Sequence, residues 1–179
     1  MIFDREKFKT LVLYVIWRTG GARDFGLTKL NKALWFAEAR SFEACGTALT
    51  GESYFRQKFG PVAMHLDEVL QELRDGQNVQ MWIEPHFDFE VTRYTTLAPP
   101  DMSTFSGPEL GFVDWWIRQV SGAHPPAPAL ARVLDYGWQI AKVGEAVPLH
   151  ALLAKRIRPP QEGDELNWAR QAATLHETT

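Results

Sequence analysis

Apolar side chains recur at helical spacing in successive stretches of this chain, and that periodicity is the feature that most constrains its fold. The first stripe contains Phe8, Leu11 and Val15, and it begins near Asp4, a residue type that caps helices. Gly20-Gly21 is predicted to end this helix. Later stripes predict helices on Leu27, Leu30, Leu34 and Ala37; on Val62, Leu66, Val69, Leu70 and Leu73; on Leu110, Val113, Trp116, Ile117 and Val120; and on Leu130, Val133, Leu134, Trp138 and Ala141.

Glycine and proline set the expected limits of these helices. Gly46 is placed to stop the second helix, and Pro61 stands where the third would begin, because a missing N–H costs least in a first turn. Pro148 is expected to open a short helix through Leu153, and a last polar segment from 163 to 176 is either a docked helix or a tail. The count is therefore about six to seven helices.

One antiparallel β-hairpin is predicted between the third helix and the helical last third. Its strands run from Val79 to Ile83 and from Phe87 to Leu97, where apolar and polar residues alternate although Arg93 interrupts the apolar face. Pro85 is expected in the turn, since proline cannot donate to a ladder. We thus expect a mainly α (α+β) fold, with winged-helix-like element order, as one domain over 1–158 and a polar segment over 159–179.

Composition limits the classes of function. The net charge is −3, so the chain as a whole lacks the basic excess that neutralises nucleic-acid phosphates. A single cysteine, Cys45, allows no internal disulfide and favours a reducing compartment. No signal peptide opens the chain, and no apolar run is long enough for a membrane helix. We expect a cytoplasmic protein without membrane contact.

The sequence holds no pattern typical of catalysis or of cofactor binding. The five histidines lie far apart, and Cys45 stands at a predicted helix end, where the dipole disfavours a thiolate. Phosphate-binding and dinucleotide-binding glycine loops are missing, as is a nucleophile elbow. We therefore expect neither an enzyme nor a metal or cofactor site.

A winged-helix, DNA-binding transcriptional regulator is the alternative that the element order raises. The third predicted helix would then enter a major groove. It carries Asp67, Glu68, Glu72 and Asp75 against the single Arg74, and these carboxylates would face phosphates. DNA is accordingly a disfavoured partner.

The segment from Tyr54 to Pro61 is the most suggestive local feature. Tyr54, Phe55 and Phe59 are interleaved with Arg56 and Lys58, a mixture that is enriched at protein interfaces. The same aromatic residues could instead cover the core between two helices, and the pattern alone leaves both interpretations open.

The chain resembles a known family in several ordered motifs. These are Thr28-Lys29-Leu30 through Trp35-Phe36-Ala37, then Gly46, Leu49-Thr50-Gly51 and Lys58-Phe59-Gly60-Pro61-Val62. In order and spacing they are similar to the Panacea (SocA-like) antitoxin domain, and the segment from Trp138 through Ala141, Gly144 and Glu145 to Val147-Pro148 resembles that family's closing motif. The resemblance covers roughly positions 8 to 153. It departs from the family where Leu134-Asp135-Tyr136 replaces a frequent Ser-His pair and where the connector from Pro125 to Pro128 is rich in proline.

The resemblance implies an antitoxin that neutralises a cognate toxin by direct protein–protein binding. It leaves open whether the antitoxin also acts as a proteolytic adaptor, with a bacterial protease or chaperone as a second partner. From the residues we expect partner contacts in the aromatic-basic segment and the adjoining second helix, with Trp35 partly exposed because it lies off the Leu27, Leu30 and Leu34 stripe. The expected partner-binding residues are Trp35, Tyr54, Phe55, Arg56, Lys58, Phe59 and His65. The expected structural residues are Gly51, Gly60, Pro61, Trp138 and Gly144.

Overall fold

Helices and short antiparallel hairpins alternate along the chain in the computed structural model, which describes residues 2–20, 22, 24–86, 89–122 and 141–150. The elements are α1 (Arg5–Thr19), α2 (Leu27–Cys45), β1 (Tyr54–Gln57), β2 (Gly60–Ala63), α3 (Leu66–Asp75), β3 (Val79–His86), β4 (Phe89–Thr96) and α4 (Gly107–Gly122). The prediction of six to seven helices with one hairpin is wrong: these ranges hold four helices and two two-stranded sheets in a mixed α+β fold.

Helix α1 forms as its sequence predicts. The Asp4 side chain accepts a hydrogen bond from the Lys7 backbone N–H at 2.9 Å and so caps the first turn. The apolar stripe that begins at Phe8 is buried along the length of the helix. Gly20 follows the last turn, as expected.

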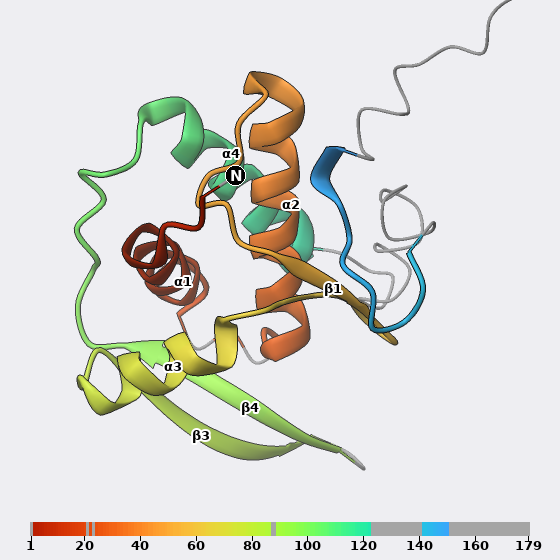
Figure 1. The fold of residues 1–179 in the computed structure, drawn as a ribbon. Helices are drawn as coiled ribbons and strands as arrows, with labels where there is room; N and C mark the ends of the chain where they lie inside the picture. Colours follow the sequence, from red (N-terminus) through yellow and green to blue (C-terminus); the bar gives the residue numbers. More distant parts are fainter. Residues whose placement is uncertain (1, 21, 23, 87–88, 123–140, 151–179) are drawn as a thin grey trace, which may run out of the picture.

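Helix α2 is the central element, and α1, α4, β2 and β4 pack against it (Figure 1). Its predicted stripe is buried at Leu30, Leu34 and Ala37. Gly46 ends the helix with φ of 73°, a left-handed conformation that favours glycine. The opposite side of α2 is buried as well, which the single predicted stripe did not anticipate.

The hairpin of β1 and β2 covers that second side. The sequence over 50–60 indicates an extended loop or short strand, but the pairing with a second strand was not predicted. Tyr54 pairs with Ala63 and Gln57 with Gly60, so Lys58 and Phe59 form the turn. Pro61 therefore lies inside β2 opposite Arg56, and the prediction that it begins the third helix is wrong. Helix α3 begins five residues later, at Leu66.

The predicted hairpin of β3 and β4 is present, and it continues through Pro85, which pairs with Glu90. The expectation that Pro85 lies in the turn is wrong. A proline fits a strand at the edge of a sheet, where its missing N–H faces away from the neighbouring strand. Arg93 is buried, and its Nε donates to Glu84 Oε2 across the hairpin at 2.9 Å, so it interrupts the apolar face without leaving its charge unpaired.

Helix α4 packs on α1 and α2. The Trp116 ring stacks on Phe36 of α2 at 4.3 Å, and the Tyr14 hydroxyl of α1 donates to Asp114 at 2.9 Å. Several predictions concern residues that the structure does not describe. They are the helix over residues 130–141 (except Ala141), the core position of Trp138, the domain limit at 158 and the segment 159–179.

Candidate partner-binding surface

The β1–β2 hairpin presents most of the residues that were expected to bind a partner. A segment near the end of the described chain extends this hairpin on its free side. The Val147 N–H donates to the Tyr54 carbonyl at 2.7 Å, and the Gly144 N–H donates to the Arg56 carbonyl at 2.8 Å. Phe55 and Ala146 form a bridge between the same two segments. Residues 144–147 thus act as a third strand that holds β1 in place.

Two of the expected contact residues lie beneath the surface instead. Trp35 has no exposed area and Tyr54 is 1% exposed, and their rings meet edge to face with centroids 5.0 Å apart. The expectation that Trp35 is partly exposed is wrong, because the hairpin covers the side of α2 from which it projects. This aromatic pair fixes the hairpin to α2 and cannot itself contact a partner in this conformation.

Phe55, Arg56 and His65 are half-buried, and Arg56 and His65 are engaged with their own chain. The Arg56 Nη1 donates to the Ala141 carbonyl, which ties the third strand further to β1. The His65 ring stacks on Phe3 at 4.5 Å, and its Nδ1 lies 3.1 Å from Glu52 Oε1. Burial raises the pKa of the Glu52 carboxyl, although the His65 contact opposes that rise. These residues support the hairpin and the N-terminal segment.

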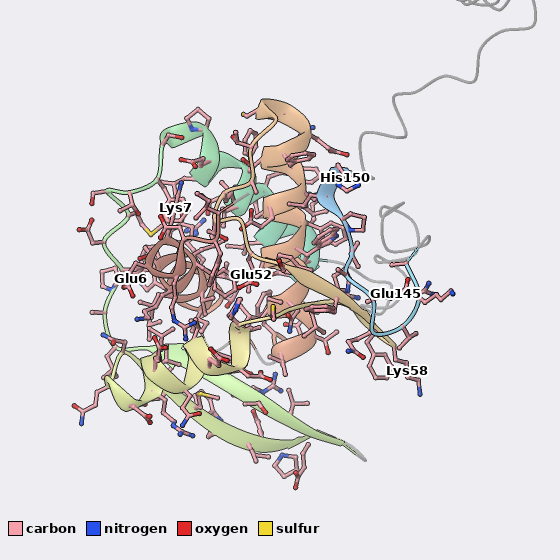
Figure 2. The ribbon with its side chains drawn as sticks, viewed as in Figure 1. Glu6, Lys7, Glu52, Lys58, Glu145 and His150 are labelled. Atoms are coloured by element: carbon pink, nitrogen blue, oxygen red, sulfur yellow. The ribbon has the colours of Figure 1, made fainter. Side chains whose placement is uncertain are left out.

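The exposed part of the set is the turn of the hairpin. Phe59 is 54% exposed and Lys58 projects from the far end of the hairpin, as Figure 2 shows. Leu27, in the first turn of α2, is 38% exposed although its stripe was predicted to be buried. We call the surface formed by Leu27, Lys58 and Phe59 the hairpin-tip surface.

A cavity of about 140 Å³ opens on the hairpin-tip surface between the hairpin and the start of α2. An apolar cavity of about this size accommodates a ring such as benzene, so one apolar side chain fits it. Leu27, Thr28 and Val62 were not expected at a site, and only recognition of two short strands facing the start of α2 would have identified them. The cavity is lined by Leu27, Thr28, Asn31, Gln57, Phe59, Gly60, Pro61, Val62 and Asp67.

The expected structural glycines have clear local reasons. Gly51 has φ of 73°, and a Cβ there would lie 2.4 Å from the Ile2 carbonyl oxygen, so the N-terminal segment can cross it only because the side chain is missing. Gly60 has φ of 134° at the end of the hairpin turn. The loop before Gly51 is anchored from α2, where the Glu38 carboxyl accepts from the Leu49 N–H at 2.7 Å and the Thr50 N–H at 3.0 Å. Burial raises the pKa of Glu38 to about 7.

Lys32 is the unusual residue of α2. Its side chain is buried, and its Nζ has no hydrogen-bond partner among the residues that the structure describes. Burial, with a smaller contribution from nearby Lys29, lowers the pKa of this ammonium group to about 8. Nearly all buried charges in proteins are paired, so Lys32 weakens the fold at neutral pH.

Two further properties concern metals and membranes. Within the described ranges, no three or more His, Cys, Asp or Glu side chains gather closely enough to hold a metal ion. The helices of those same ranges are all too short or too polar to span a bilayer.

Taken together, the described residues define a mixed α+β fold with four helices and two hairpins, in which residues 144–147 are bridged to β1. The family model for the antitoxin SocA-like, Panacea domain matches residues 30–124, which is more than half of the chain. The chain belongs to this family, and the resemblance is confirmed, although the match does not extend to the motif at 138–148. Neither the curated proteins nor the solved structures contain a match.

Proposed function

We propose that this chain is the antitoxin of a toxin–antitoxin pair and that it neutralises its cognate toxin by binding it directly through the hairpin-tip surface. The main support is the open, largely apolar cavity beside the exposed Phe59 ring, in a domain that belongs to an antitoxin-like family. Interface hot spots commonly consist of an anchor residue that fills such a pocket.

The rigidity of the hairpin supports this role. Trp35 and Tyr54 fix β1 from below, and residues 144–147 hold it from the side. A preorganised surface loses little conformational entropy when a partner binds, so more of the contact energy contributes to affinity. The turn that carries Lys58 and Phe59 is thus exposed but well supported.

The chemistry of the surface indicates what the toxin presents. The cavity accepts an apolar side chain, and the Phe59 ring offers a second apolar contact beside it. The Lys58 ammonium lies 5.4 Å from the centre of the Phe59 ring and stands at the rim, where it suits an acidic group on the toxin.

Co-expression tests the proposal. Expression of the gene next to this one should arrest growth, and addition of this chain should restore it. We expect Phe59→Asp or Leu27→Asp to abolish the rescue, because each places a carboxylate in an apolar contact. Val143→Asp is the matched control, since Val143 is 67% exposed and does not line the cavity.

Two outcomes would contradict the proposal in different ways. A harmless neighbouring gene would remove the toxin and with it the function. If both cavity variants are folded by circular dichroism and still restore growth, the hairpin-tip surface is not the toxin-binding site, although the antitoxin function stands. The amount of toxin in rescued cells separates blocking, which leaves it unchanged, from delivery to a protease, which lowers it.

A further inference from the structure

Among the described residues, no strand pairs with the outer edge of β3, and the first five residues of this strand carry no charge. β3 and β4 pair only with each other within the described residues, and in Figure 1 no other described element lies beyond β3 at the bottom of the molecule. Two large apolar side chains of β3 are exposed, Trp82 by 42% and Ile83 by 64%. Proteins that remain monomeric usually protect such an edge with charges or prolines.

The residues of β3 that would prevent pairing with another strand lie only at its C-terminal end. Residues Val79 to Ile83 carry no charge, whereas Glu84 and Pro85 follow directly. The Leu97 N–H donates to the Asn78 carbonyl at 3.4 Å, and hydrogen-bonded pairs alternate along an antiparallel ladder. The alternation turns the backbone groups of Val79, Met81 and Ile83 outward, and Pro85 also falls on this outward set, where it lacks an N–H.

One antiparallel register uses all three outward-facing residues. When two copies are related by a two-fold axis at Met81, Met81 pairs with Met81 of the second copy and Val79 pairs with Ile83. The exposed Ile83 side chain then lies between Thr92 of its own β4 and the apolar Val79 of the second copy. No like charges face each other within the five paired residues, so the strand is complementary to itself.

A groove beside this edge fits the same register. It has a volume of about 720 Å³ and is lined by Arg74, Gln77, Val79, Gln80, Met81, Trp82 and Leu97. In the register centred on Met81, Trp82 of the second copy lies opposite Gln80, which lines the groove. Its indole therefore reaches a pocket that has Leu97 as an apolar wall and the Arg74 guanidinium as a cation at its rim.

We infer that β3 is a homodimer interface, through which two copies of this chain pair antiparallel about Met81 into one four-stranded sheet. This inference does not depend on the antitoxin function, because it uses neither the hairpin-tip surface nor a toxin.

The mass of the full chain in solution tests the interface. Light scattering after size exclusion should give twice the mass of one chain. Ile83→Lys should give the mass of one chain, because it places two ammonium groups in the pairing region while the exposed position tolerates lysine in the monomer. Val143→Lys and Phe59→Asp, which lie elsewhere, should keep the double mass. A wild-type chain that runs as a monomer, or a dimer that Ile83→Lys leaves intact, would overturn the inference.

A cysteine scan tests the register. In a Cys45→Ser background, Met81→Cys should form an intermolecular disulfide on mild oxidation, because hydrogen-bonded partners have Cα atoms about 5.5 Å apart, within disulfide range. Gln80→Cys is the control, since the two Gln80 residues would be diagonal neighbours roughly 7–8 Å apart. Equal crosslinking at both positions, or none at Met81, would contradict the pairing.

Discussion

Two buried ionisable residues of α2 have opposite effects on the stability of the fold. Lys32 is buried with no hydrogen-bond partner in the described part of the chain, whereas Glu38, six residues further along α2, accepts hydrogen bonds from two backbone N–H groups. The first of these buried charges costs stability, and the second anchors a loop.

Lys32→Met should therefore stabilise the domain at pH 7, by about 1–3 kcal/mol, because it removes an unpaired buried charge and keeps the volume. The folded-state pKa of about 8 lies below the usual 10.5, so the unfolded chain binds more protons between these values. Wild-type stability should thus rise from pH 7 to 9.5, by roughly 1–2 kcal/mol, and the variant should lack this rise.

Urea denaturation at both pH values measures this effect. Lys7→Met is the control, because the Lys7 ammonium pairs with Glu109 at 2.7 Å and its removal should not stabilise the fold. If Lys32→Met unfolds more easily than the wild type, the ammonium group has a stabilising partner after all.

At the scale of elements, the sequence predicted the helices with apolar stripes far better than the short strands. Asp4, Gly46 and the stripe through Phe8 gave α1 and α2 nearly to their ends. The four-residue strands β1 and β2 are too short for alternation to be distinct, and Pro61 resembles a helix start as much as a residue in a strand. The error at Pro61 carried over to the site, because the missed hairpin is what buries Trp35 and Tyr54 and leaves Phe59 exposed.

The turn of that hairpin depends on Gly60. Gly60→Ala should lower the free energy of unfolding by about 1–3 kcal/mol, because φ of 134° is strained for any residue with a Cβ. Gly111→Ala in α4 is the matched substitution: a Cβ there meets nothing within 4 Å, and alanine favours a helix, so the melting temperature should stay the same or rise. Equal melting temperatures for the wild type and Gly60→Ala would show that the turn relaxes at little cost.

At the scale of the whole molecule, charge argues against the DNA-binding alternative. Glu72 of α3 pairs with Arg5 and Lys9 of α1, so these two cations beside α3 are already paired with a carboxylate. With a net charge of −3, we expect no specific gel shift of its own promoter at physiological salt. A shift that persists at that salt and weakens in Lys58→Ala would favour a regulator instead.

The third strand beside β1, residues 144–147, is synthesised well after the hairpin that it supports. Arg56 and the Ala141 carbonyl that it binds are 85 residues apart in sequence, so the hairpin leaves the ribosome long before its lateral support is synthesised. Until residues 144–147 emerge, the edge of β1 is open. A nascent or truncated chain that ends before this point contains every residue of the hairpin-tip surface but lacks the strand that holds it still.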